Sequence, residues 1–291
     1  MLDHNIDLNL LYTLWVVSEA GGVGEAAKRL NRSQPAISIR LKQLEEQLGT
    51  KLFDRVGRRL VLRPSARAAI ETLRYMQRDL SSAIEILRSE HSLQQGTLKI
   101  GTLPTVGLHI LAPIIARFSK KFPLIKIRQF SGLTGEQMKA LRIGEIDFVS
   151  SVGPESFSSA QMRHVGRVRP VLAVPKGHAL AALKDIGPDD LKKERLIAFP
   201  RVGDPFFDTV CDFWEKHGLD SNIVAEIPHI HTIQSLTQKG VGLGVIPDYT
   251  LDTKYLVGVP ITGLDSEFPI WIAVREGALK IPLLNAFWEM F

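Results

Sequence analysis

Near its amino terminus the chain contains Asn31-Arg-Ser-Gln-Pro-Ala-Ile-Ser-Ile-Arg-Leu-Lys-Gln-Leu-Glu-Glu-Gln-Leu48, which reads as a short turn followed by a helix. On the helical period of about 3.6 residues, one narrow face of this helix is apolar and is predicted to face a core. That face carries Ile37, Leu41, Leu44 and Leu48. The opposite face is polar and basic in its amino-terminal half, so it is available to a partner.

A second short helix is predicted directly upstream, at residues 25–30, where Ala26 and Ala27 allow close packing. Two short helices joined by a tight turn, the second exposing a polar amino-terminal half, fit the major groove of DNA. The pair therefore predicts a helix-turn-helix that reads DNA.

The charge of this region supports the same interpretation. Between Gly22 and Ala68 there are 11 basic and 4 acidic residues, a net charge of +7, whereas the whole chain has +5. A basic excess confined to one segment is typical of phosphate contact. Charge alone would favour a solvated basic face. Together with the helix pair it favours DNA.

A β-ribbon is predicted after the helix pair, because residues 51–55 and 59–62 flank the turn Val56-Gly57-Arg58. Such a ribbon beside a recognition helix is a wing, and an arginine at its tip can enter a minor groove. The candidate DNA-contacting residues are Arg32, Ser33, Gln34, Pro35, Ser38, Ile39, Arg40, Lys42, Arg55, Arg58 and Arg59.

A long helix is predicted from Pro64 to about Ser92, with apolar residues spaced alternately by four and three. This heptad pattern is typical of a seam between two helices, although a helix packed on its own domain would fit as well. We favour a dimer seam. Its predicted residues are Leu73, Met76, Leu80, Ala83 and Leu87, and residues 91–96 form the linker that follows.

From Thr97 onward, strands alternate with helices, which predicts mostly parallel sheets covered on both faces. The predicted strands are 98–103, 124–130, 146–152, 171–174, 196–199, 223–227, 243–246 and 268–274. The predicted helices are 109–121, 135–142, 205–217, 232–239 and 283–291.

Composition narrows the class of protein. A length of 291 residues allows two or three domains with real cores. No apolar run approaches the ~20 residues of a membrane span, and the amino terminus lacks the pattern of a signal peptide. Cys211 is the only cysteine, so a sensor built on a cysteine pair within one chain is excluded. We expect Cys211 to be a small buried hydrophobe and the chain to be cytoplasmic.

Several motifs resemble the LysR-type transcriptional regulators over the full length of the chain. The most specific are Ala26-Ala-Lys-Arg-Leu-Asn-Arg-Ser-Gln-Pro-Ala-Ile-Ser38, Leu44-Glu-Glu-Gln-Leu-Gly49 and Leu52-Phe-Asp-Arg55. Gly144-Glu-Ile-Asp-Phe148 and Gly240-Val-Gly-Leu-Gly-Val-Ile-Pro247 resemble the effector-domain signatures of that family.

The resemblance implies a bacterial regulator that binds promoter DNA as a dimer of dimers and is switched by a small-molecule effector. It implies an α+β chain: a winged helix-turn-helix domain at 1–63, a linker and dimerisation helix at 64–92, and an α/β effector domain at 93–291. The effector domain would resemble a type 2 periplasmic binding protein. Its first lobe would be about 97–162 plus 268–291 and its second about 164–267, with crossovers near 162–171 and 265–271.

The chain departs from the family pattern at three places. Val23-Gly24 replaces the usual Phe and Ser or Thr, so the side-chain oxygen that would cap the first short helix is missing. Ile39 replaces the usual arginine after the recognition-helix serine, which removes a polar base contact. Arg63-Pro-Ser-Ala66 replaces the usual start of the linker helix. These changes bear on strength and site preference rather than on the class of protein.

Three other classes of function were considered. Gly22 and Gly24 lie in a G-x-G-x-x-A pattern after an apolar run, which would suit an NAD(P)-dependent enzyme if strands flanked it. His229 and His231 could bind a metal, but further ligands at a recognisable spacing are absent. A pure small-molecule binding protein would not need the winged unit. We therefore predict no enzyme activity, metal or cofactor.

An effector site is predicted where the strands of the two lobes end, because ligands of open α/β sheets bind beyond the carboxyl ends of strands. Hydroxyl groups, helix amino termini and one arginine suit a small organic anion. Loop capping is the alternative role for each of them. The candidate effector-binding residues are Thr102, Leu103, Pro104, Thr105, Ser131, Thr134, Ser150, Arg201, His229, His231 and Thr232.

Overall fold

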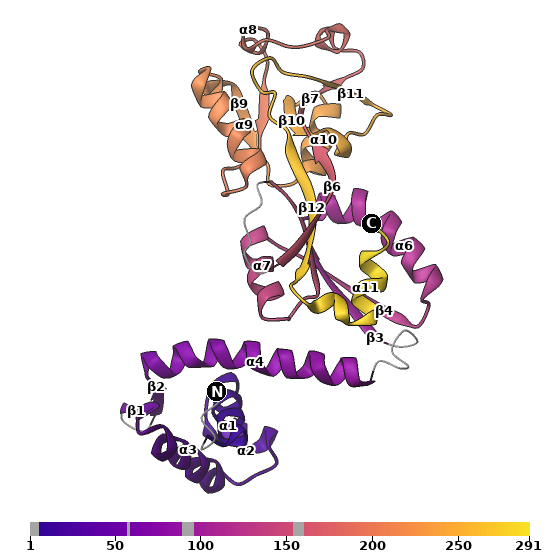
Figure 1. Ribbon diagram of the computed structural model, residues 1–291. Coiled ribbons are helices and arrows are strands. Elements are labelled where there is room, and N and C mark those ends of the chain that lie inside the picture. The colour runs from indigo at the N-terminus through magenta and orange to yellow at the C-terminus, as the bar shows by residue number, and fades with distance from the viewer. Residues whose placement is uncertain (1–5, 57–58, 89–95, 154–159) are drawn as a thin grey trace. The chain divides into compact units, whose positions relative to one another are not determined.

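The computed structural model describes residues 6–56, 59–88, 96–153 and 160–291 (Figure 1). The chain forms two compact units, Met1–Leu87 and Arg88–Phe291. Within the described residues, no helix combines the length and the apolar character that crossing a membrane requires.

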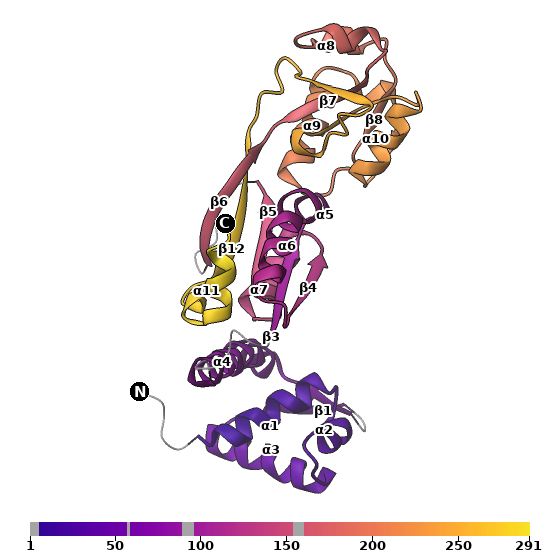
Figure 2. The ribbon, with the colours of Figure 1, turned by 90° about the vertical axis from the view of Figure 1, so that its right-hand side faces the viewer.

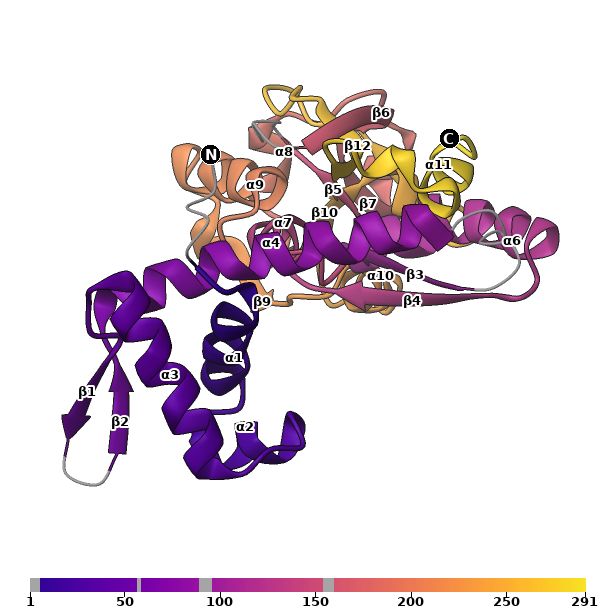
Figure 3. The same ribbon diagram turned by 60° about the horizontal axis from the view of Figure 1, so that its bottom comes forward.

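The first unit is a three-helix domain with a β-ribbon and a long final helix (Figure 3). Its elements are α1 (Leu8–Glu19), α2 (Val23–Arg29), α3 (Gln34–Leu48), β1 (Phe53–Val56), β2 (Arg59–Leu62) and α4 (Pro64–Arg88). Apolar residues from α1, α2, α3 and the start of α4 meet in one core. The side chains of Leu14, Ile37 and Leu44 are almost fully buried there.

 The predicted apolar face of α3 is therefore its buried face.

Local sequence explains where α3 begins and ends. Ser33 caps its amino terminus, where the Ser33 hydroxyl accepts a hydrogen bond from the Ala36 amide at 3.4 Å. Gly49 ends the helix in the left-handed conformation, with φ of 63°. By contrast, α2 is preceded by Gly22 and has no side-chain cap, as the sequence predicted.

The wing is tied to α3 through Glu45. One carboxylate oxygen of Glu45 accepts hydrogen bonds from the amides of Leu52 and Phe53, at 2.8 and 3.4 Å, and the other contacts Lys51 Nζ at 3.1 Å. Burial by itself would raise the pKa of Glu45, but these contacts outweigh it and the pKa is lowered. The antiparallel ribbon pairs Phe53 with Leu62.

Helix α4 changes its surroundings along its length. Ala66 and Ile70 are buried in the core of the first unit, and Leu73 is partly buried there. Further along, Met76 and Leu80 have exposed fractions of 40% and 61%. The start of α4 thus packs on its own domain, which was the alternative interpretation, while the apolar stripe continues onto an exposed part of the helix.

The second unit contains two lobes, each built on a five-stranded sheet. The first has the strand order β4-β3-β5-β12-β6. Its elements are β3 (Gly96–Thr102), α5 (Pro104–Val106), the π-helical segment η2 (Gly107–Leu111), α6 (Ala112–Lys121), β4 (Ile125–Ser131), α7 (Thr134–Arg142), β5 (Phe148–Val152), β6 (Ala160–Val168), β12 (Phe268–Arg275), η6 (Ala278–Lys280) and α11 (Pro282–Trp288).

Alternate residues of the central strands face opposite sides of this sheet. Phe148 and Ile272 pack with Phe118 of α6 and Phe287 of α11 on one side. On the other side, α7 packs on the neighbouring strand residues, among them Trp271. The sheet is therefore covered on both faces, as predicted.

The second lobe has the strand order β11-β7-β10-β8-β9. Its elements are β7 (Pro170–Pro175), η3 (Ala179–Ala182), α8 (Pro188–Leu191), β8 (Leu196–Ala198), α9 (Pro205–Lys216), η4 (Asp220–Asn222), β9 (Ile223–Glu226), α10 (Ile230–Gln238), β10 (Leu243–Pro247), η5 (Asp248–Thr250) and β11 (Leu256–Val259).

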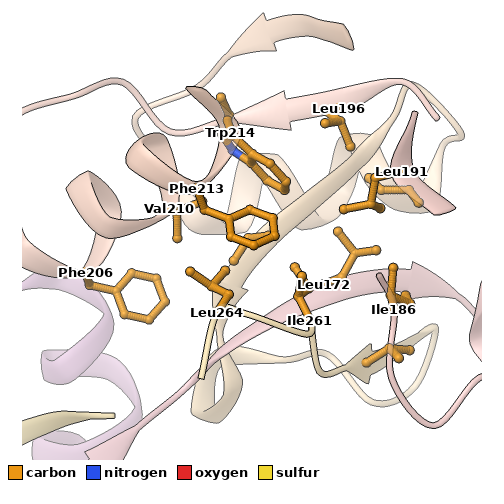
Figure 4. Close-up of a cluster of buried hydrophobic side chains, with 14 of the residues drawn as sticks. Leu172, Ile186, Leu191, Leu196, Phe206, Val210, Phe213, Trp214, Ile261 and Leu264 are labelled. Atoms are coloured by element: carbon orange, nitrogen blue, oxygen red, sulfur yellow. The ribbon is translucent and has the colours of Figure 1, made fainter. Parts of the chain in front are cut away.

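Helix α9 supplies the largest side chains of the second lobe's core. Trp214 and Phe213 have exposed fractions of only 1% and 5%. Figure 4 shows both rings directed into a cluster with Leu172, Ile261 and Leu264. Helix α10 packs on the opposite face through Ile233. Both lobes are thus three-layer structures, and the apolar cluster of the second lobe also takes in Val106 and Val152 of the first.

The two sheets are mixed rather than mostly parallel, which corrects the expectation from the strand–helix alternation. In the first lobe β3 is parallel to β4 and β5, whereas β12 is antiparallel to β5 and β6. In the second, β7 is antiparallel to β10 and β11. The antiparallel strands arise because the chain passes from one lobe to the other along β6 and returns along β12 (Figure 2).

Candidate DNA-binding surface and effector site

The amino-terminal half of α3 presents most of the predicted base-reading residues. Gln34, Pro35 and Ser38 are exposed, and Ile39 has an exposed fraction of 58%. Ile37, between them, is fully buried and anchors the helix to the core. An exposed isoleucine on such a face is suited to a thymine methyl group.

The basic residues of this surface differ in how freely their charges can reach a phosphate. Arg32 and Ser33 are exposed in the turn before α3. Arg40 is half-buried and donates to the buried Thr13 hydroxyl at 3.3 Å. Lys42 lies 3.6 Å from a carboxylate oxygen of Glu46, and both side chains are mostly exposed.

Of the three arginines predicted in the wing, the structure describes only the backbones of Arg55 and Arg59. Arg58 lies outside the described residues, as do the side chains of Arg55 and Arg59. The backbones of Arg55 and Arg59 belong to β1 and β2, which border the tip of the ribbon. These three contacts remain predictions.

In the second unit, a polar cluster joins the first lobe to the second. The hydroxyls of Thr105, in α5, and Tyr249, in η5, are 2.9 Å apart. The ring of His109, in η2, has its centroid 5.8 Å from the Tyr249 ring and 5.8 Å from the His231 ring. We call Thr105, His109, His231 and Tyr249 the inter-lobe cluster.

The helix that carries His109 is tightly packed and irregular. A Cβ atom placed on Gly107 would lie 2.6 Å from Gln129 Nε2 and 2.9 Å from Thr102 Cγ2, so only glycine fits there. The segment Gly107–Leu111 is π-helical, an irregularity often found at functional sites. Close packing and the π turn together set the position of His109.

Two side chains of the inter-lobe cluster, His109 and Tyr249, favour their uncharged forms. Burial lowers the pKa of His109, and the nearby His231 lowers it further. Burial raises the pKa of Tyr249 to about 12, although the hydrogen bond with Thr105 acts in the opposite direction. The carboxylate of Asp204, which caps α9, adds to this rise. At neutral pH the cluster therefore offers a neutral imidazole and a phenol.

Among the predicted effector residues, Thr105 and His231 meet in this cluster. His229 and Thr232 are exposed at the start of α10, and Pro104 and Ser131 are exposed at the ends of β3 and β4. Leu103 is half-buried beside them. His109 and Tyr249 are not among the residues that the sequence predicts for this site.

Other predicted hydroxyls have partners within the first lobe. Thr102 is fully buried and donates to the Leu103 carbonyl at 3.1 Å. Ser150 is fully buried and donates to the Trp271 carbonyl at 3.0 Å. Thr134 bonds to the hydroxyl of Ser151. In this conformation, Thr102 and Ser150 turn their hydroxyls to backbone acceptors.

Arg201 is engaged with two carboxylates of α9. One of its terminal nitrogens lies 2.7 Å from Asp212 Oδ1 and 3.0 Å from Glu215 Oε1. The hydrogen bonds that Arg201 donates to Asp212 and Glu215 raise the pKa of Arg201 above its ordinary value. Its charge is balanced in this structure, so an anion at Arg201 would compete with both carboxylates.

The described residues contain no group of three or more His, Cys, Asp or Glu side chains able to hold a metal ion. Cys211 is half-buried, and its thiol donates to the Phe199 carbonyl at 3.5 Å. Burial raises the pKa of that thiol, which disfavours the reactive thiolate. The dinucleotide interpretation fails because the segment before Gly22 is the helix α1 and not a strand.

Comparison with known proteins agrees with this division of the chain. Residues 8–69 match the family described as bacterial regulatory helix-turn-helix protein, lysR family, and residues 91–291 match the LysR substrate binding domain. The regulator AlsR of Bacillus subtilis is 29% identical over 256 residues, covering 86% of this chain and 85% of AlsR.

Two solved structures share the fold. Full-length OxyR of Pseudomonas aeruginosa has a TM-score of 0.71 at 19% identity, covering 99% of this chain and 95% of that one. Full-length CbnR complexed with its target DNA has a TM-score of 0.62 at 23% identity, covering 98% of both chains. The chain belongs to the LysR-type family of DNA-binding transcriptional regulators, with a carboxy-terminal effector-binding domain.

Proposed function

We propose that this regulator reads promoter DNA with the amino-terminal half of α3, dimerises through α4, and responds to a small organic anion held between the two lobes. Two such dimers would assemble on one promoter in the bacterial cytoplasm. The observation that carries the DNA-binding part is the exposure of Gln34, Pro35, Ser38 and Ile39 on a helix anchored by the buried Ile37.

The role of each DNA contact follows from its chemistry. Gln34 can bond bidentately to adenine, and Ile39 can contact a thymine methyl group. Arg32 and Lys42 are placed to meet phosphates, which fix the register without reading sequence. CbnR, whose fold this chain shares, has been solved with its target DNA, and this supports the same use of the helix-turn-helix here.

The replacement Gln34→Ala tests base reading. Loss of a bidentate contact should lower discrimination at one base pair by ~1–3 kcal/mol, with little change in binding to random DNA. A pool of random duplexes is first selected with the wild-type chain. Fluorescence anisotropy then compares the enriched duplex with its single-base-pair variants.

Gln43→Ala is the matched control, because Gln43 is exposed on the same helix and lies nine residues from Gln34, about half a turn around the helix axis. It should leave base preference unchanged. Equal discrimination by the wild-type chain and Gln34→Ala would remove Gln34 from the reading of bases.

The effector proposal rests on two helix amino termini, one from each lobe. The helical segment that begins at Pro104 and the helix α10 that begins at Ile230 both lack a side-chain cap. Their first amide groups have no partner within the helix and favour a negative charge. The inter-lobe cluster brings these two segments together through the contact between His109 and His231.

A thermal-shift screen of the full chain tests the effector class. Small carboxylates should raise the melting temperature with increasing concentration, because ligands that bind only the folded state stabilise it by mass action. Neutral sugars of similar size serve as the comparison. A shift with sugars and none with carboxylates would overturn the assignment to an anion.

A further inference from the structure

We infer that Gly24 is a specificity-determining residue of the DNA-binding domain, because its lack of a side chain lets the amide of Gln34 lie against α2. This inference rests on the proposed base-reading role of Gln34. It concerns a residue on the other helix of the pair, which positions the reader and is not itself required to contact a base.

The two residues come from different helices and meet at the turn between them. Gly24 lies in the first turn of α2, and Gln34 is the first residue of α3. A Cβ atom placed on Gly24 would lie 3.2 Å from Gln34 Nε2 and 3.8 Å from Gln34 Cδ. The first distance is shorter than ordinary van der Waals contact, so a methyl group there would require the amide to move by a few tenths of an ångström.

Backbone conformation does not account for glycine at this position. Gly21 and Gly49 have φ of 72° and 63°, in the left-handed region that favours glycine. Gly24 lies within a regular helix, where alanine is the more favourable residue. Among the described glycines of this unit, Gly24 alone has a neighbouring side chain within 4 Å, and that side chain is Gln34.

The surroundings show why the position of this amide matters for DNA. Gly24 and Gln34 line a pocket of about 380 Å³ with the basic residues Lys28 and Arg32. Lys28 pairs with Glu25 on the exposed surface of α2, whereas Arg32 is exposed in the turn. The Gln34 amide thus lies beside groups suited to phosphate contact.

Contact with Gly24 limits the conformations of a long side chain before DNA arrives. A side chain held close to its bound position loses less entropy when it forms a hydrogen bond. A methyl group at position 24 would shift the amide by a few tenths of an ångström. Because Gln34 is exposed, the domain would accommodate the change without unfolding. The consequence should fall on base discrimination and not on stability.

A double-mutant cycle tests the inference in the full chain. Wild type, Gly24→Ala, Gln34→Ala and the double variant are compared on the duplex enriched from a random pool and on its single-base-pair variants. Gly24→Ala should lower discrimination at the base pair read by Gln34 by about fivefold or more. This is the lower end of the discrimination that one bidentate contact supplies. In the Gln34→Ala background it should have no further effect, because the two substitutions act on one interaction.

Two controls separate positioning from damage to the fold. The melting temperature of Gly24→Ala should equal or exceed that of the wild-type chain, since alanine favours the helix. Gly22→Ala adds the same methyl group where no atom lies within 4 Å, and it should leave base preference unchanged.

Each outcome of the cycle supports or overturns the inference. If Gln34→Ala alters discrimination and Gly24→Ala does not, the inference fails while the role of Gln34 stands. If Gly24→Ala acts equally in both backgrounds, its methyl group affects DNA directly and positioning of Gln34 is wrong. If Gln34→Ala has no effect, both the base-reading role and the inference are overturned.

Discussion

At the scale of single residues, His109 is the group whose protonation should matter most to the effector domain. Its Nε2 atom is buried and has no hydrogen-bond partner among the described residues. Burial lowers its pKa, and the His231 ring, 5.8 Å away, adds to the effect when it is charged. Tyr249, on the other side, is a neutral phenol near pH 7, and burial raises its pKa further. The folded state therefore prefers the neutral imidazole of His109.

Acidification should consequently destabilise the domain through His109. In the unfolded chain His109 returns to an ordinary pKa of 6.5, so below that pH the unfolded state binds more protons than the folded one. The contribution of neutral His109 is fully present above 6.5 and is lost as the pH falls toward the lowered pKa of the folded state. Thermal denaturation of the full chain at about pH 7.5 and about pH 5.5 measures this loss.

The matched variants are His109→Gln and His229→Gln. The loss of melting temperature on acidification should be smaller in His109→Gln than in the wild-type chain, because the titrating group is gone. His229 is exposed and makes no capping hydrogen bond through its side chain, so His229→Gln should behave as the wild type does. Identical losses in all three proteins would show that His109 does not titrate in this window.

Residue types predicted some of the candidate site and missed the rest for a physical reason. Thr105 and His231 stood out because they follow or precede predicted elements at strand ends. His109 sits among Leu108, Ile110 and Leu111, so its sequence context resembles an ordinary helix that packs in a core. Its contact with Tyr249 joins segments that are far apart in the chain, and local sequence cannot reveal such a pairing.

At the scale of elements, the helices with strong periodicity and clear caps were predicted best. Helix α3 ends at Leu48 before Gly49, where the sequence placed its end. The strand–helix pattern did not mark β6, which lies at the edge of its sheet and has only Val168 fully buried, although the family resemblance implied a crossover near 162–171. Its partner β12 comes from the end of the chain, so neither periodicity nor a turn signal marks the pairing.

Helix α4 carries the prediction that belongs to this scale. Leu80 has an exposed fraction of 61% in the single chain. In the sequence it occupies the same heptad position as Leu73 and Leu87. If this stripe packs against a second copy of α4, Leu80→Asp would place a charge against an apolar partner. The free energy of dimer formation would then be less favourable by about 3 kcal/mol or more. Sedimentation velocity of the full chain should then show a shift toward monomer.

The control for that experiment is Ala68→Asp. Ala68 is exposed on the same helix but lies off the heptad stripe, so the same charge there should leave the association state unchanged. A Leu80→Asp protein that sediments as the wild type does would assign dimerisation to another surface. A shift caused equally by Ala68→Asp would indicate damage to the helix rather than to a seam.

At the scale of the whole effector domain, the lobes are joined by apolar contacts of Val106 and Val152 with the second lobe's core, and by two further kinds of connection. The chain crosses between them along β6 and β12, where Glu267, just before β12, contacts both Arg167 and Arg169. These exposed ion pairs contribute little by themselves. The second connection is the inter-lobe cluster, in which Thr105 and Tyr249 share a hydrogen bond. Covalent crossovers persist in any conformation, whereas the hydrogen bond exists only while the lobes remain in contact.

Tyr249→Phe should therefore favour separation of the lobes without disturbing either core. The phenylalanine ring keeps the contact with His109, and only the hydrogen bond to Thr105 is lost, a contribution of about 0.5–1.5 kcal/mol. Hydrogen exchange of the full chain should become faster at residues 104–111 and 248–250, by about twofold to twelvefold, and should stay unchanged in the central strands β5 and β10.

The cycle with Thr105→Val makes this prediction specific. Since both substitutions remove the same hydrogen bond, the double variant should exchange no faster than either single one. Tyr255→Phe, at an exposed tyrosine of the same lobe, should have no effect. A ligand that bridges the lobes would bind the joined state, so its affinity should fall in proportion to the fraction of protein in that state. Unchanged exchange in Tyr249→Phe would mean that the crossovers and the apolar contacts set the position of the lobes, and that an effector need not act through this hydrogen bond.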